Sequence, residues 1–169
     1  MTMENEAPIL DRAAMADRCT QWRAEGRKVV FTNGVFDLVH RGHVTYLGAA
    51  AKLGDVLVVG LNDDASVRRL GKGADRPIVP EADRAFVVAG LRAVSGVVLF
   101  GEDTPLELIR ALEPDVLVKG GDYDATCTDP EDARYIVGSA EVRAAGGRIE
   151  TIALVPGRST TAIADRLKG

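Results

Sequence analysis

The sequence predicts one doubly wound α/β domain, in which helices cover both faces of a single parallel β-sheet. Three observations lead to this class. Short apolar runs rich in Val and Ile alternate about five times with helical patterns. These runs are apolar on both faces, as strands of a buried parallel sheet are. The chain of 169 residues is long enough for one full core but too short for two ordinary domains with a linker.

Five strands are expected, in a Rossmann-like sheet. They cover Lys28–Asn33, Asp55–Asn62, Gly96–Phe100, Asp115–Gly121 and Arg148–Leu154. A spatial order of 3-2-1-4-5 would place the first and fourth strands side by side where the strand order reverses, which is where such folds bind ligands. These two strands end in polar stretches that contain glycine, TNGVFD and KGGDY. We therefore expect a binding crevice between their carboxyl ends.

Six helices are expected before, between and after these strands. Their patterns cover Leu10–Ala24, His43–Gly54, Glu81–Val94, Thr104–Pro114, Ser139–Gly147 and Ser159–Gly169. Gly and Pro residues at several C-terminal ends are typical helix stops. The first helix belongs to an expected N-terminal helical extension, residues 1–26, and the domain as a whole is expected to cover residues 1–169.

The composition favours a globular protein with small-molecule partners. Hydrophobic residues make up 46% of the chain, which is too apolar for a disordered segment. The net charge of -4 argues against a broad basic face for nucleic acid. The sequence has no signal-peptide pattern and no run of 18 apolar residues to span a membrane. Its two distant cysteines lack CxxC spacing and suit a reducing compartment, so we expect a cytoplasmic protein without membrane or nucleic-acid partners.

Both histidines of the chain, His40 and His43, lie in the stretch TNGVFDLVHRGH. A helix is expected to begin near Arg41 or Gly42, where free backbone N–H groups would attract phosphate. The stretch is neither a Walker A loop nor a dinucleotide fingerprint. Three interpretations compete: a structural pair, a zinc site that would need further ligands, and a pair of hydrogen-bond donors for phosphate oxygens. We favour the third, because such donors stabilise shifting negative charge in phosphoryl-type transfer.

The motif HRGH and its context resemble the HxGH nucleotidyltransferase superfamily, which is cytidylyltransferase-like. Four stretches in order look like the heptose 1-phosphate adenylyltransferase domain of lipopolysaccharide-precursor enzymes: TNGVFDLVHRGHVTYLGAAAKLGD, VGLNDDASVRRLGKGADRPIVPEADR, EPDVLVKGGDY and VPGRSTTAI. The match runs from about Arg27 to Leu167. Glycerol-3-phosphate cytidylyltransferase and its relatives are similar more distantly, because their RTxGxSTT pattern has an arginine where Leu154 stands here.

The resemblance implies transfer of AMP from ATP to D-glycero-D-manno-heptose 1-phosphate, which gives ADP-heptose and pyrophosphate by direct in-line displacement. Mg²⁺ would accompany ATP, and no protein ligand is expected for it. One alternative is a cytidylyltransferase acting on a polyol phosphate of the glycerol 3-phosphate type. Another is a nucleotide-binding module without turnover. In many heptose enzymes this domain is fused to a sugar kinase. For this chain we expect the sugar kinase to be a separate protein of the same pathway. Homodimers are common in the family, so a homodimer is possible here.

The resemblance also assigns roles to residues. The expected catalytic residues are His40, His43 and Lys52, with the lysine returning to the phosphates from one helix length downstream. Besides the histidines, the expected nucleotide-binding residues are Thr32, Asn33, Gly34, Val35, Phe36, Asp37, Lys119, Gly121, Asp122, Ser159, Thr160 and Thr161. The expected substrate-binding residues are Asn62, Asp63, Arg76, Arg84, Asp122 and Tyr123.

Some of these segments also have an ordinary structural interpretation. Asp37 could hold its own turn together through backbone N–H groups, and Ser159 is an ordinary helix N-cap residue. The loop Leu70–Pro80 contains Lys72 and is either a mobile basic flap over the nucleotide or an exposed connector. The acidic loop Asp122–Tyr135 could shape a sugar pocket.

Overall fold

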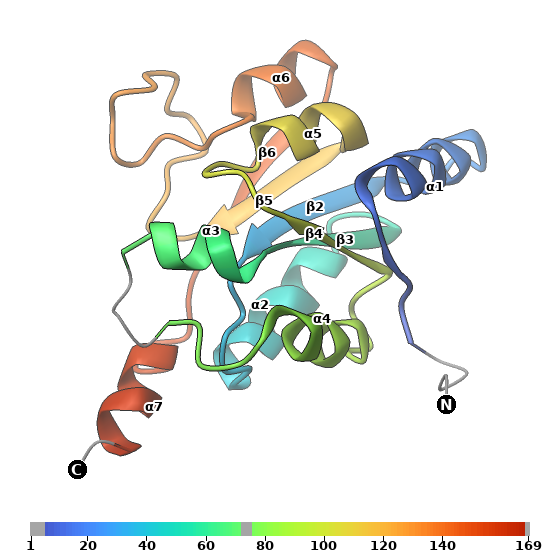
Figure 1. Ribbon diagram of the computed structural model, residues 1–169. Coiled ribbons are helices and arrows are strands. Elements are labelled where there is room, and N and C mark those ends of the chain that lie inside the picture. Colours follow the sequence, from blue (N-terminus) through green and yellow to red (C-terminus); the bar gives the residue numbers. More distant parts are fainter. Residues whose placement is uncertain (1–5, 72–75, 168–169) are drawn as a thin grey trace.

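The structure is a computed structural model that describes residues 6–71 and 76–167 (Figure 1). One all-parallel sheet runs through it, with the strand order β1-β4-β3-β2-β5-β6. The strands are β1 (Ile9–Leu10), β2 (Val29–Gly34), β3 (Val56–Asn62), β4 (Gly96–Phe100), β5 (Val116–Gly120) and β6 (Arg148–Ile152). The helices are α1 (Arg12–Ala24), α2 (Arg41–Ala51), α3 (Asp64–Arg69), α4 (Glu81–Ala89), α5 (Leu106–Leu112), α6 (Ser139–Ala144) and α7 (Thr160–Leu167).

The predicted α/β class and the relative order of the five predicted strands are confirmed, because those strands correspond to β2 through β6. The predicted number of strands is wrong. β1 adds a sixth strand at the edge beside β4, within the segment expected as a helical extension. Two residues are too few for a strand pattern to show in the sequence. Helix α1 follows after Asp11, whose carboxylate accepts a hydrogen bond from the Ala14 N–H at 2.8 Å and caps the helix.

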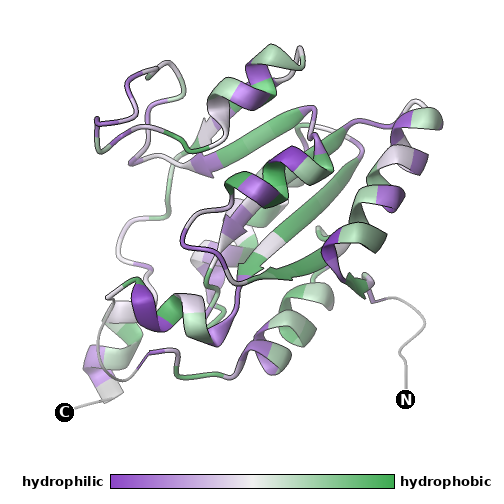
Figure 2. Cartoon of the chain, turned by 45° about the horizontal axis from the view of Figure 1, so that its top comes forward, coloured by the Kyte–Doolittle hydropathy of each residue, from purple (hydrophilic) through white to green (hydrophobic). Residues whose placement is uncertain are grey.

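Helices cover both faces of the sheet, as a doubly wound fold requires. Alternation along β2 sends Val29 and Phe31 into one apolar cluster with Trp22, and Val30 into another with Leu47. Helices α1, α5 and α6 cover the first face, and α2 and α4 cover the second (Figure 1). Figure 2 shows hydrophobic strands beneath helices that carry hydrophilic residues. Within the two described ranges, no helix is long and apolar enough to cross a membrane.

The centre of the sheet provides the place for a site. β2 pairs with β3 on one side and with β5 on the other, so the strand order reverses there. The carboxyl ends of β2 and β5 therefore lie next to each other, and the polar residues that follow both strands face a common region. Ligands of doubly wound folds bind at this switch point.

Candidate active site

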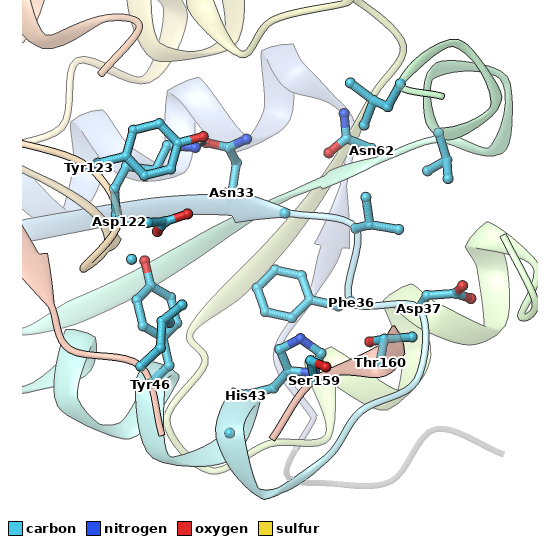
Figure 3. Close-up of a pocket in the computed structure, with 18 of the residues that line it drawn as sticks. Asn33, Phe36, Asp37, His43, Tyr46, Asn62, Asp122, Tyr123, Ser159 and Thr160 are labelled. Atoms are coloured by element: carbon cyan, nitrogen blue, oxygen red, sulfur yellow. Dashed lines mark hydrogen bonds between the residues drawn. The ribbon is translucent and has the colours of Figure 1, made fainter. Parts of the chain in front are cut away.

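A cavity of about 900 Å³ opens at the carboxyl ends of β2 and β5. Its walls include the loop after β2, the start of α2, the end of β5 and the segment that leads into α7. In Figure 3, His43 and Ser159 lie on one side of this space, and Asn33 and Asp122 lie on another. The predicted site residues that line it are Asn33, Gly34, Val35, Phe36, Asp37, His40, His43, Asn62, Arg76, Lys119, Asp122, Tyr123, Ser159, Thr160 and Thr161.

Other predicted site residues lie outside the lining, namely Thr32, Lys52, Asp63, Arg84 and Gly121. Thr32 is buried in β2, where its Oγ1 lies 2.8 Å from the Tyr46 hydroxyl. Asp63 caps α3 by accepting a hydrogen bond from a backbone N–H three residues later at 2.6 Å. A Cβ on Gly121 would lie 3.2 Å from Ala153 Cα, so the glycine lets the chain after β5 pass close to the chain after β6.

The expected catalytic residue Lys52 is not brought to the cavity. It follows the last residue of α2, and its side chain is exposed. The histidines stand at the first turn of the same helix, and eleven residues of helix span about 16 Å at 1.5 Å per residue. One helix length therefore separates Lys52 from the histidines in this structure, and a catalytic role for Lys52 stays a prediction.

Arg84 also has a different place from the one expected. Its side chain is fully buried. The guanidinium donates hydrogen bonds to the carbonyls of Val79 at 2.9 Å, Val35 at 2.7 Å and Asn62 at 2.9 Å, and it pairs with Asp64 at 2.6 Å. These partners come from the loop after β2, the end of β3, the start of α3 and the segment before α4. Arg84 thus holds the frame of the cavity together, and the expected contact with a substrate phosphate stays a prediction.

The two histidines form a stacked pair at the start of α2. His40 is the N-cap residue, and its Nδ1 accepts a hydrogen bond from the Gly42 N–H at 3.0 Å. The His43 ring stacks on it with 4.0 Å between centroids, and the Phe36 ring lies 5.1 Å from His43 on a tilted plane. A Cβ on Gly42 would lie only 2.8 Å from His40 Cε1. The glycine between the histidines is therefore required for the stack.

Both imidazoles are neutral at pH 7. Burial, and then the neighbouring His40, lower the pKa of His43 to about 4, against a backbone interaction with Leu38 that raises it. Within the described chain, the buried Nδ1 of His43 makes no hydrogen bond of ordinary geometry. Burial, and then the positive charge of Arg158, lowers the pKa of His40 below its usual 6.5. The pair can therefore supply hydrogen-bond donors but not positive charge.

Asp37 ties the loop after β2 to the segment before α4. Its carboxylate accepts hydrogen bonds from the N–H groups of Ile78 at 2.8 Å and Val79 at 2.9 Å, and from Arg76 at 2.7 Å. Burial alone would raise the pKa of Asp37, but the bonds from Val79, Arg76 and Ile78 hold it below its usual value. The carboxylate thus joins two segments rather than closing its own turn. Lys72, from the same predicted flap as Arg76, lies outside the described residues.

Polar contacts also organise the opposite wall. Lys119, from β5, donates a hydrogen bond to Asn33 Oδ1 at 2.6 Å across the switch point. Its ammonium lies 5.5 Å from the centroid of the Tyr123 ring. These contacts fix the carboxyl ends of β2 and β5 relative to each other, beside Asp122.

Tyr46 and Arg158 are among the lining residues that the set of predicted site residues lacks. Tyr46 comes one helical turn after His43, and that spacing is a signal that could have found it. Burial raises the pKa of its hydroxyl to about 12, although the hydrogen bond with Thr32 lowers it. Arg158 directly precedes the predicted hydroxyl cluster, so its position in the sequence was a signal as well.

A parallel sheet that presents a His-x-Gly-His turn at its switch point, with a Ser-Thr-Thr helix start on the same cavity, defines a nucleotidyltransferase. A family model described as cytidylyltransferase-like matches residues 31–166. The chain belongs to this family.

Similar proteins agree with this assignment. The chain is 51% identical over 166 residues to the bifunctional protein HldE of Wolinella succinogenes and 53% identical over 166 residues to that of Magnetococcus marinus. Each alignment covers 98% of this chain and 32% of the relative, so the chain spans about a third of the length of these curated relatives. A solved structure, the lipopolysaccharide core biosynthesis protein from Thermoplasma volcanium, matches with a TM-score of 0.58 and 28% identity, covering 77% of this chain and 98% of that one.

Proposed function

We propose that the chain transfers AMP from ATP to D-glycero-D-manno-heptose 1-phosphate, producing ADP-heptose and pyrophosphate. One observation carries this proposal: a single cavity at the switch point joins the stacked neutral histidines to Asp122 and to the hydroxyls of residues 159–161. Its volume of about 900 Å³ suits a nucleotide together with a small second substrate. The stretch KGGDY and Leu154 before the STT cluster support a sugar phosphate over a polyol phosphate. Similarity to a lipopolysaccharide core biosynthesis protein supports the same choice.

The proposed step is one in-line displacement. An oxygen of the sugar 1-phosphate forms a bond to the α-phosphorus, the bond from that phosphorus to the bridging oxygen breaks, and pyrophosphate leaves with the electron pair. The attacking oxygen is already ionised, so the protein contributes positioning and charge stabilisation. Because His40 Nδ1 accepts from Gly42, the proton of the neutral ring is on Nε2, which makes Nε2–H a donor for phosphate oxygens.

Magnesium bound to ATP would supply charge neutralisation along the phosphates. In residues 6–71 and 76–167, no group of three or more His, Cys, Asp or Glu side chains could hold a metal ion. Mg²⁺ usually keeps several waters and binds substrate phosphates. The donor set therefore fits an ion that is held mainly by ATP and water.

The proposed substrate requires a preceding reaction. A sugar 1-phosphate forms when a sugar kinase transfers a phosphoryl group to the anomeric hydroxyl. The expected separate kinase stays a prediction, and so does the homodimer.

A nucleotide screen tests the proposed function. With heptose 1-phosphate as acceptor, pyrophosphate release is expected to be faster with ATP than with CTP by roughly 10²-fold or more in kcat/KM. The same screen includes glycerol 3-phosphate as acceptor. Faster release with CTP and glycerol 3-phosphate would establish the cytidylyltransferase alternative, whereas calorimetric ATP binding without product over hours would establish the nucleotide-binding module.

Lys52→Ala tests whether this lysine contributes to the reaction. Because the side chain is exposed and lies away from the cavity, kcat and the KM for ATP are expected to change by less than about twofold, as for most surface substitutions. Steady-state pyrophosphate release measures both constants. A tenfold or larger fall in kcat would instead show that Lys52 takes part in catalysis.

A further inference from the structure

The cavity needs a source of positive charge that the histidines do not provide. Three cationic side chains of the described residues line it: Arg76, Lys119 and Arg158. Arg76 is paired with Asp37 at 2.7 Å, and Lys119 donates to Asn33 at 2.6 Å. Within the described chain, the guanidinium of Arg158 has no hydrogen bond or ion pair. It is therefore the lining cation whose donors are available to a ligand.

Arg158 lies directly against the His-x-Gly-His turn. A Cβ on Gly42 would lie 3.2 Å from the Arg158 carbonyl oxygen and 2.8 Å from His40 Cε1. The glycine thus lets the segment before α7 approach the first turn of α2. The positive charge of Arg158 acts on His40, since it lowers the pKa of that ring in addition to burial.

The residues after Arg158 form the opening of an eight-residue helix, α7. Ser159 Oγ accepts a hydrogen bond from the Ala162 N–H at 3.1 Å, which caps this helix. In the view of Figure 3, Ser159 and Thr160 lie on the same side of the cavity as His43. A guanidinium, a helix N-terminus and an imidazole pair therefore border the same part of the cavity, and each of them favours a phosphate oxygen.

We propose that Arg158 is a catalytic residue that binds the β- and γ-phosphates of the nucleotide and stabilises pyrophosphate as it leaves. The inference rests on the proposed nucleotidyl transfer and adds the residue that receives the leaving group. When the bond between the α-phosphorus and the bridging oxygen breaks, the electron pair stays on pyrophosphate and its charge rises. The planar guanidinium offers paired donors that match two phosphate oxygens and adds a permanent positive charge.

Substitutions at residue 158 test this role. Arg158→Ala is expected to lower kcat/KM for ATP by roughly 10²-fold, the scale of one preorganised donor. The affinity for pyrophosphate alone, measured by calorimetry, is expected to fall by about tenfold or more. Arg158→Lys keeps the charge but loses the paired donors, so its losses should be intermediate. Arg166→Ala is the matched control, because it removes an exposed arginine of α7 that does not line the cavity.

Thermal unfolding of each variant shows whether the fold is retained, and Arg158→Lys serves if the alanine variant is unstable. Unchanged pyrophosphate affinity in folded Arg158→Ala would overturn the proposal, and so would an equal loss in Arg166→Ala. The calorimetric experiment uses pyrophosphate without sugar or nucleotide. A chain that binds pyrophosphate through Arg158 but makes no product with any sugar phosphate would refute the proposed function and still support phosphate binding by Arg158.

Discussion

His43→Ala is expected to lower kcat by roughly 10²–10³-fold, the range for loss of one preorganised donor, while the fold is retained. The ring is held in place on one side by the His40 stack, at 4.0 Å between centroids, and by Phe36 at 5.1 Å. It is also neutral at pH 7, because burial lowers its pKa to about 4. The hydrogen bond from such a fixed, neutral donor to a phosphate oxygen becomes stronger as negative charge develops on that oxygen. Steady-state pyrophosphate release with ATP and heptose 1-phosphate measures the loss.

Two conservative variants show which nitrogen acts. Because Nδ1 of His43 is buried, Nε2 is the nitrogen that can reach a phosphate. A glutamine amide extends to about the position of Nε2, whereas an asparagine amide extends only to that of Nδ1. His43→Gln should therefore retain more activity than His43→Asn. His40→Ala is expected to lose turnover in the same range, and losses below about tenfold in both alanine variants would contradict the assigned role.

Arg84→Met is expected to reduce the free energy of unfolding by about 3–5 kcal/mol, the cost of removing one partner from a buried ion pair. The side chain has 0% exposure, and its loss would leave Asp64 and the carbonyls of Val35, Asn62 and Val79 without these donors. Methionine fills much of the same volume, so the variant tests the polar contacts more than the packing. Urea denaturation gives the change.

Arg68→Ala is the control for Arg84→Met, because Arg68 is an exposed arginine of the neighbouring helix α3. Its effect should stay within about 0.5 kcal/mol. If Arg84→Met cost no more than this control, the frame described for Arg84 would be wrong. Loss of pyrophosphate release at full stability would instead indicate the substrate contact that the sequence first predicted.

The sequence predicted the centre of the fold better than its margins. Strands β2 to β5 are continuous apolar runs buried on both faces, and the polar stretches after β2 and β5 indicated which ends meet. β1 was not predicted, because two residues carry no periodicity and its pairing with β4 depends on tertiary contact. The six-residue helix α3 was not predicted either, because it is too short to show a 3.6-residue pattern.

The candidate site shows the same limit. Residues close to the histidine motif were placed in one cavity because local spacing governs a helix start. Lys52 and Arg84 depend instead on distant geometry. Spacing along the chain did not reveal that α2 carries Lys52 away from the histidines, or that Arg84 finds a carbonyl 49 residues away at Val35. The position of Arg158 before the hydroxyl cluster was visible in the sequence, but its closeness to Gly42 arises only after β6 and α7 are in place.

The cavity is completed by α7, which is separated from β6 by residues 153–159 without helix or strand. A triphosphate bound in the cavity would contact both the start of α2, near residue 40, and the start of α7. Thermodynamic reciprocity then applies: whatever affinity the ligand gains from α7 is returned as resistance of α7 to local unfolding. Ligand affinity and the free energy of local unfolding of the carboxyl-terminal segment consequently report the same coupling free energy.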